Sequence, residues 1–478
     1  MTKTKTKKDK LSDKLFFSLK NCWEGIDTKT EKEIENLASS YKRFLDMGKT
    51  ERECVDVICD LLEKNGFVNI ETFNKTFKPG TKVYKNIRGK SVIAAVIGKK
   101  PAVEGCNILG AHLDSPRLDL KQNPLYEDSE LALFDTHYYG GIKKYQWTTI
   151  PLAMHGVIVN EAGKKITIKI GEEPGDPVFT ITDLLPHLAK EQMEKKASVA
   201  VEAEDLDILA GSRPYAAKSD STDVKEVKEK VKLALLALLH EKYGIIERDF
   251  AGAEIEFVPA FKASDVGLDR SMIGAYGQDD RCCAWPALQA FLALANAVPE
   301  KTLVCYFSDK EEIGSAGNTG ARSNNFENFM VLLCGGNEMA LRQCFSRSSM
   351  LSSDVNAAFD PAYASVFDKK NASYIGKGIA LSKYTGSGGK YGASDANAEF
   401  CAKVQAILNR NKVQWQFGAL GKVDKGGGGT IALYAAHLGM DVLDCGVPIL
   451  SMHSPFEVIS KVDLYTTYRG YLAFLKEA

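Results

Sequence analysis

The chain has 478 residues, of which 45% are hydrophobic and 26% are charged. This usage is that of an ordinary globular protein with a sizeable core, and the length favours two domains. Its 61 Lys and Arg residues against 62 Asp and Glu residues give a net charge of −1. Such a balance argues against a nucleic-acid partner and against an electrostatic membrane partner.

The compartment is indicated by the termini and the cysteines. No stretch approaches the roughly 20 apolar residues that span a bilayer, and Leu15-Phe16-Phe17 is too short for the apolar part of a secretion signal. Residues 1–10 are expected to form a solvated tail. The 11 cysteines are odd in number and include no Cys-x-x-Cys pair, so neither a disulfide framework nor a structural zinc motif is indicated. We expect a cytoplasmic protein whose partner is a small molecule or a peptide.

The first elements alternate between helix and strand. Apolar residues at helical spacing predict a helix over residues 53–64, which stops before Gly66. Short β-branched runs predict buried strands at 91–97 and 107–111. Later in the chain, strands are expected at 302–307 and 330–334, and helices at 284–297, 394–409, 430–438 and 461–476. This alternation predicts an α/β fold in which helices cover both faces of a sheet.

The stretch between residues 117 and 247 differs in character. Apolar runs at 157–159 and 166–170 flank a turn-like segment and predict a β-hairpin. Residues 203–222 are polar and irregular, as in a long loop, and apolar residues at steps of three and four predict a helix over 223–243. We therefore expect an inserted domain at 117–247, and a main domain formed by 1–116 and 248–478.

Candidate chemistry begins with His112, at the end of the strand predicted for 107–111. Open α/β sheets place their ligands at the carboxyl ends of strands. Asp114 stands two residues further on, where it can accept the second imidazole N–H and orient the ring, as residues behind a metal-binding histidine do. The alternative is a structural histidine with an ordinary hydrogen bond.

Two adjacent acids, Glu311 and Glu312, follow the strand predicted for 302–307. Metal binding favours an ionised carboxylate, whereas a general base has to be free of the metal and within reach of a water molecule. Adjacent acids can divide these two roles, but they are also common on solvated loops. Taken one at a time, three further residues have no assigned role, because a helix cap or another structural role explains each of them equally well. They are Asp279, Asp354 and His453.

The five motifs together are more informative about function than any one of them alone. In chain order they read His-x-Asp, Asp, Glu-Glu, Asp, His, and each motif lies in a turn next to an apolar run. The pattern resembles the aspartyl aminopeptidase family of co-catalytic zinc metallopeptidases. The segments that carry the resemblance are 110–116, 276–290, 307–317, 352–363 and 451–459.

The resemblance implies a zinc-peptidase fold, a mixed sheet sandwiched by helices, with an inserted, mainly β dimerisation domain. It implies two divalent ions per subunit, with Zn²⁺ expected and Co²⁺ or Mn²⁺ as alternatives. One ion would be bound by His112 and Asp354, and the other by Glu312 and His453. Asp279 would bridge them, and Glu311 would be the general base, with Asp114 as an orienting residue.

The implied function is hydrolysis of N-terminal residues from short peptides, with acidic residues as one candidate class. Lys383 or Lys425 could meet an acidic side chain. Family members form dimers that assemble into a tetrahedral dodecamer, and His155 matches a histidine that they extend into a neighbouring subunit's active site. The alternative for His155 is a histidine whose hydrogen bonds are satisfied within the inserted domain. Two alternatives are a related metal-dependent deacylase or carboxypeptidase, and a catalytically silent assembly protein.

Overall fold

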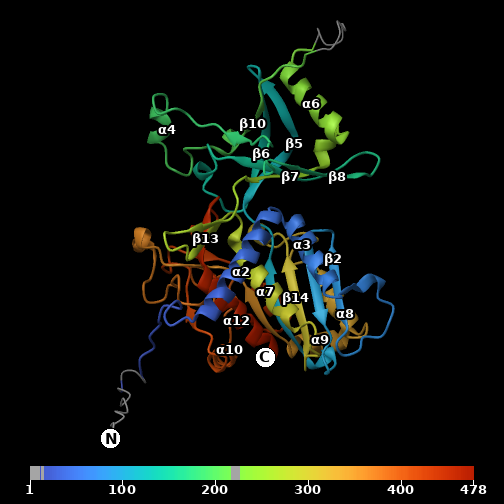
Figure 1. Ribbon diagram of the computed structural model, residues 1–478, viewed down its shortest axis with the longest axis vertical. Coiled ribbons are helices and arrows are strands. Elements are labelled where there is room, and N and C mark those ends of the chain that lie inside the picture. The colour runs from blue at the N-terminus through green and yellow to red at the C-terminus, as the bar shows by residue number, and fades with distance from the viewer. Residues whose placement is uncertain (1–10, 12–14, 217–226) are drawn as a thin grey trace.

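The computed structural model describes residues 11, 15–216 and 227–478. Two lobes make up this part of the molecule (Figure 1). The lower lobe in that view holds a large sheet with helices on both faces, and the upper lobe holds a second sheet with α6 beside it. The expected tail at residues 1–10 lies outside the described residues.

The main sheet is mixed, as predicted. Its central strands β14, β4, β15 and β21 run parallel, while β3 and β17 on either side run antiparallel to them. The strands expected at 91–97, 107–111 and 302–307 are confirmed as β3, β4 and β14. Across the sheet the order is β1 (Val68–Asn69), β2 (Lys82–Ile87), β3 (Ser91–Val96), β14 (Thr302–Ser308), β4 (Cys106–His112), β15 (Ser349–Ser353), β21 (Asp441–Gly446), β17 (Ile379–Ser382) and β19 (Trp415–Phe417).

Helices cover both faces of this sheet because alternate side chains of a strand point to opposite faces. On β14, for example, Leu303 and Cys305 pack in one hydrophobic cluster, whereas Val304 and Tyr306 pack in another. The first cluster is completed by α2 (Thr28–Met47), α3 (Glu51–Lys64), α7 (Gln278–Leu294), α10 (Ala398–Arg410) and α12 (Lys461–Glu477). The second is completed by α8 (Asn325–Leu333), α9 (Glu338–Ser346) and α11 (Ala432–His437).

The strand expected at 330–334 is wrong, because α8 occupies that stretch. Phe326, Phe329, Met330 and Leu333 lie on the buried side of α8, at helical spacing. A short apolar run does not by itself distinguish a buried strand from a buried helix. The helices expected at 53–64, 284–297, 394–409, 430–438 and 461–476 are confirmed as α3, α7, α10, α11 and α12, with shifted ends.

The second sheet has seven strands, and all of its pairs are antiparallel. The predicted hairpin is confirmed, since Val159 of β7 pairs with Lys165 of β8. In order, the strands are β8 (Lys165–Ile170), β7 (Leu152–Val159), β11 (Glu254–Pro259), β5 (Arg117–Asp128), β6 (Leu131–Tyr139), β10 (Ile208–Gly211) and β9 (Thr180–Ile181). In the described part of this stretch they are accompanied by the helices α4 (Lys190–Glu194) and α6 (Lys230–Tyr243).

Three details of the insert differ from expectation. The stretch expected as a loop at 203–222 contains β10, which pairs with β6. The helix expected over 223–243 begins at Lys230, and residues 223–226 lie outside the described part of the chain. The sheet also includes β11, beyond the expected boundary at residue 247, because β11 lies between β7 and β5. We therefore place the end of the insert at Pro259.

A five-stranded sheet lies next to the carboxyl edge of the main one. It contains β12 (Ser264–Val266), β13 (Met272–Ala275), β23 (Glu457–Ser460), β22 (Pro448–Leu450) and β16 (Asn356–Ala357). Two glycine-rich strands, β18 (Gly386–Ser387) and β20 (Gly427–Gly428), pair separately. Among the helices of the described residues, none combines the length and the apolar character needed to cross a bilayer.

Candidate metal centre

Most of the predicted site residues lie at one edge of the main sheet. His112 ends β4, Glu311 and Glu312 follow β14, and Asp354 follows β15. Since these strands are parallel neighbours, their carboxyl ends meet at the same edge. Two further residues reach this edge from other elements: Asp279 from the first turn of α7 and His453 from the turn between β22 and β23.

Asp279 stands between the two histidines. Its Oδ1 atom is 3.3 Å from Nε2 of His112, and its Oδ2 atom is 3.2 Å from Nε2 of His453. The ligand atoms fall into two groups, each within 4.8 Å: His112, Asp279 and Asp354 form one, and Asp279, Glu312 and His453 form the other. Asp279 is therefore common to two adjacent ligand groups.

Hydrogen bonds orient both imidazoles toward Asp279. Nδ1 of His112 donates to the backbone oxygen of Asp114 at 3.0 Å, and Nδ1 of His453 donates to the backbone oxygen of Gly141 at 3.0 Å. A carbonyl oxygen only accepts, so the proton is on Nδ1 in each ring. In the neutral form of each ring, the form that binds a metal, Nε2 therefore carries the lone pair and faces Asp279.

The residues present fit a pair of divalent cations. Within the described part of the chain, Oδ1 of Asp279 and Oε1 of Glu312 are buried and have no hydrogen-bond partner. Burial and then the charge on Asp279 raise the pKa of Glu312, and burial and then Asp280 raise that of Asp354. Such crowded carboxylates gain from a cation. Imidazole and carboxylate ligands together suit zinc.

Glu311 belongs to neither ligand group but lies beside them. Its Oε2 atom is 3.9 Å from Nε2 of His112. Burial raises the pKa of Glu311 to about 7. Asp114 holds the backbone of this loop, because its Oδ1 accepts from the Glu311 amide at 3.0 Å and its Oδ2 from the Glu312 amide at 3.1 Å. The Asp114 Oδ1 atom is also 3.3 Å from Nδ1 of His112.

A cavity of about 840 Å³ opens over this centre. Its wall includes Asp279, Glu311, Glu312, Asp354 and His453, together with the glycine-rich segments 386–390 and 426–429. Apolar side chains such as Val355, Leu420 and Met452 supply much of the remaining wall. The cavity is large enough for the end of a peptide.

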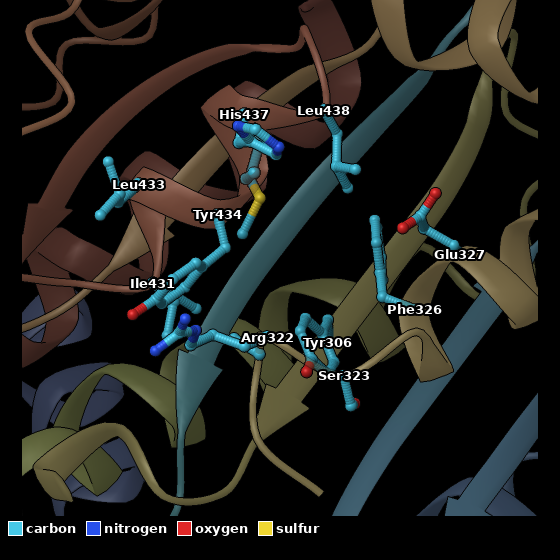
Figure 2. Close-up of a pocket in the computed structure, with 13 residues that line it drawn as sticks. Tyr306, Arg322, Ser323, Phe326, Glu327, Ile431, Leu433, Tyr434, His437 and Leu438 are labelled. Atoms are coloured by element: carbon cyan, nitrogen blue, oxygen red, sulfur yellow. The ribbon is translucent and has the colours of Figure 1, made fainter. Parts of the chain in front are cut away.

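A second cavity, of about 430 Å³, lies between α8 and α11. Figure 2 shows Phe326 facing the side chains of α11 across it, with Arg322 beside Tyr434. Leu433 and Tyr434 line both cavities, and the Tyr434 hydroxyl donates to the Gly314 backbone oxygen at 3.2 Å. The second cavity therefore adjoins the first through these two residues, and none of the predicted site residues lines it.

His155 lies in the junction between the two lobes. Its side chain is fully buried, with Nδ1 2.9 Å from Glu53 Oε1 and Nε2 3.2 Å from Glu172 Oε2. Glu53 is fixed in turn by the capping box that starts α3, where it accepts from the Thr50 amide. Nδ1 is thus hydrogen-bonded to Glu53, whereas Nε2 faces Glu172 but has no hydrogen-bond partner within the described residues. The expected reach of His155 into a neighbouring subunit's active site stays a prediction.

Sequence patterns missed three residues that support the centre. Glu457 is buried, and its carboxylate accepts from the backbone amides of Gln278, Asp279 and His453 at 2.7, 3.1 and 2.8 Å. A charged residue between apolar Phe456 and Val458 was the available signal. Tyr139 and Gly141 contact Asp114 and His453 from the inserted domain, and nothing in their local sequence pointed to this site.

Comparison with known proteins agrees with this architecture. Residues 44–475 match the family model described as aminopeptidase I zinc metalloprotease (M18). The chain is 53% identical to a probable M18 family aminopeptidase 1 of Clostridium acetobutylicum, over 96% of this chain and 99% of that protein. A corresponding protein of Thermotoga maritima is 48% identical, again over 96% and 99%.

Solved structures agree as well. The crystal structure of the M18 aminopeptidase of Thermotoga maritima superposes with a TM-score of 0.90 at 46% identity, covering 97% of this chain and all of that one. Aminopeptidase I of Clostridium acetobutylicum gives 0.89 at 48%, covering 96% and 100%. The fold is also that of the S. cerevisiae mApe1 dodecamer, with a TM-score of 0.74 at 22% identity over 93% and 97%. The chain therefore belongs to the M18 family of zinc metalloproteases and is an aminopeptidase.

Proposed function

We propose that the chain removes N-terminal residues from short peptides in a two-metal site. His112 and Asp354 would hold one divalent cation, Glu312 and His453 the other, and Asp279 would bridge the two. The observation that carries this proposal is the position of Asp279, whose two carboxylate oxygens face one histidine each at 3.3 and 3.2 Å. Zinc is the metal that the ligands favour, with cobalt or manganese as alternatives.

When bound, two cations lower the pKa of a water molecule between them and polarise the peptide carbonyl. Glu311 then acts as the general base. Its carboxylate lies beside His112 and outside both ligand groups, so it is free to accept a proton from the attacking water and to pass it to the leaving amine. With water as the nucleophile, no covalent intermediate with the protein is needed. Asp114 keeps Glu311 in place by accepting from its amide.

The charges around the cavity bear on the substrate class. Lys383 and Lys390 are both paired with Asp395, at 2.6 and 2.9 Å, and Lys390 lines the cavity. One carboxylate offsets only one of the two lysine charges, so an acidic N-terminal residue would meet a net positive charge that Asp395 weakens. We infer that acidic N-terminal residues are attracted less strongly here than they would be by two unpaired lysines.

Assembly and location belong to the same proposal. A related yeast protein was solved as a dodecamer, and we propose that this chain forms dimers through its inserted domain and a tetrahedral dodecamer from those dimers. Sedimentation that finds only monomer at micromolar concentration would contradict this. The eleven cysteines are free thiols, which supports a reducing, cytoplasmic location.

Hydrolysis of a panel of aminoacyl chromogenic substrates by the zinc-loaded protein tests the proposal. Glu311→Gln should lower kcat by roughly 10²–10⁴-fold, the usual contribution of a general base. Glu399→Gln, on the exposed side of α10, is the control and should behave as wild type. N-acetylated substrates should resist cleavage, which separates an aminopeptidase from a deacylase or carboxypeptidase. A wild-type protein that cleaves none of the panel, or an undiminished Glu311→Gln variant, would refute the proposal.

A further inference from the structure

The inserted domain reaches the metal centre through three consecutive residues, Tyr139, Gly140 and Gly141. Tyr139 is the last residue of β6 in the seven-stranded sheet, and the two glycines follow it. Each of the three contacts a different residue of the centre, or a residue that holds it. Although the insert forms a separate lobe (Figure 1), this segment is therefore part of the wall behind the ligands.

The first contact is made by the Tyr139 hydroxyl, which donates to Asp114 Oδ2 at 2.9 Å. Asp114 is the carboxylate that accepts from the backbone amides of Glu311 and Glu312. Tyr139 thus holds Asp114, which in turn holds the loop that carries Glu311 and Glu312. Burial and the nearby Asp114 charge raise the pKa of Tyr139, so its hydroxyl keeps the proton that it donates.

Tyr139 is itself held firmly. The guanidinium carbon of Arg117 lies 3.8 Å from the centre of the tyrosine ring, a cation–π contact. Arg117 in turn pairs with Glu256 at 3.2 Å and with Glu51 at 3.6 Å. Glu256 belongs to the insert and Glu51 begins α3 of the main domain, so the ring is clamped where the two lobes meet.

The two glycines make the other contacts. The Gly141 backbone oxygen accepts from Nδ1 of His453 at 3.0 Å and so sets the tautomer of that ring. Gly140 has φ of +74°, and a β-carbon there would lie 3.3 Å from Cβ of Glu312. A β-carbon on Gly141 would lie 3.3 Å from Nδ1 of His453. A β-carbon at either position would require these ligands to shift by a few tenths of an ångström, and the positive φ of Gly140 favours glycine further.

We propose that Tyr139 and Gly141 are positioning residues for the cation held by Glu312 and His453. This rests on the proposed function, because it assumes two cation sites. The inserted domain then completes one half of the metal centre in addition to any part in assembly. The other half depends on it less directly. Asp354 follows β15 of the main sheet, and Tyr139 reaches His112 only through Asp114, whose backbone oxygen accepts from Nδ1 of His112 and whose Oδ1 lies 3.3 Å from it.

Chelator competition on the zinc-loaded full chain tests this directly, with bound zinc per chain as the readout. Tyr139→Phe removes the hydroxyl but keeps the ring over Arg117. Gly141→Ala pushes a methyl group against His453 without removing any hydrogen bond. In each variant one zinc ion should leave at roughly 10–100-fold lower chelator concentration than in wild type, the usual effect of losing a partner behind a ligand. The second ion should leave as in wild type in Gly141→Ala, and in Tyr139→Phe it should be weakened less than the first, because Asp114 also lies beside His112.

The control is Tyr138→Phe, which alters the neighbouring tyrosine, 40% exposed, and should match wild type. Activity gives a second readout: kcat should fall in both variants while KM stays near the wild-type value. Melting of the zinc-free proteins reports whether each variant folds. If Tyr139→Phe proves unfolded, Gly141→Ala alone decides.

The outcomes are distinct. Wild-type zinc retention in the folded variants would overturn the inference, and so would an equal weakening of both ions. Failure of wild type to bind two ions would instead refute the proposed function, and with it the premise of this inference. Loss of one ion at low chelator concentration, with the other retained, supports it.

Discussion

Replacing Asp395 with asparagine should make the enzyme accept acidic substrates better. Asp395 pairs with two lysines at once and offsets one of their two charges: Nζ of Lys383 is 2.6 Å from its Oδ1, and Nζ of Lys390 is 2.9 Å from its Oδ2. The variant frees both positive charges at a cavity that Lys390 lines. A carboxylate on the N-terminal residue would then meet two unpaired positive charges, where wild type presents two lysines that share one carboxylate.

The solvent exposure of the three side chains limits how far the substrate preference can change. The three side chains are between 42% and 45% exposed, so solvent screens the new attraction, and exposed pairs of this kind change an equilibrium by at most about fivefold. We therefore expect the ratio of kcat/KM for glutamyl over leucyl p-nitroanilide to rise by about two- to fivefold. The rise should shrink in about 1 M salt, where the screening length is only about 3 Å.

Asp424→Asn is the matched control. It removes the same charge beside Val423, a residue that lines the cavity, but leaves Lys383 and Lys390 paired with Asp395. A ratio that stays constant in Asp395→Asn would refute the reasoning about paired lysines. An equal rise in Asp424→Asn would show that the overall charge of the cavity, not this pairing, decides specificity.

Two more predictions concern stability. Burial lowers the pKa of His155, but Glu172 and Glu53 outweigh it and raise the pKa above 6.5. The charged ring therefore stabilises the fold below pH 6.5, and this contribution is lost as the pH rises through the folded pKa. In urea denaturation, His155→Gln should cost about 3 kcal/mol at pH 6, at the lower end for a broken buried pair, and less at higher pH; a cost independent of pH would contradict this. Chelation should abolish activity, which added zinc should restore. It should also lower the melting temperature, since a ligand at a thousand times its Kd adds about 4 kcal/mol; an unchanged melting temperature would count against buried cation sites.

The surroundings of His155 within the chain could not be predicted from its local sequence. The histidine lies on β7, and the fold brings Glu53 of α3 and Glu172 of the insert to either side of it. A buried imidazole between two carboxylates is held by both. Its local sequence is compatible with an exposed position as well, and only the approach of the two lobes decides between them.

Local patterns were sufficient for much of the catalytic domain. The β-branched runs of β3, β4 and β14 and the apolar spacing of α3, α10 and α12 follow from each segment's own burial, so they can be recognised without knowing their partners. The same patterns place His112 and Glu311–Glu312 at strand ends, and parallel strands bring such ends together. The positions of these residues depend only on the pairing of neighbouring strands and on no other contact between distant segments.

What the sequence by itself determined, then, was the α/β class, the presence of an insert and the identity of the residues gathered around Asp279. Tertiary structure alone decided that α8 is a helix, that β11 closes the second sheet, and that Tyr139, Gly141 and Glu457 support the site. The physical reason is common to all of these. Each depends on contacts between segments far apart in the chain, such as Tyr139 with Asp114 or Glu457 with Asp279, and such contacts leave no periodicity in the local sequence.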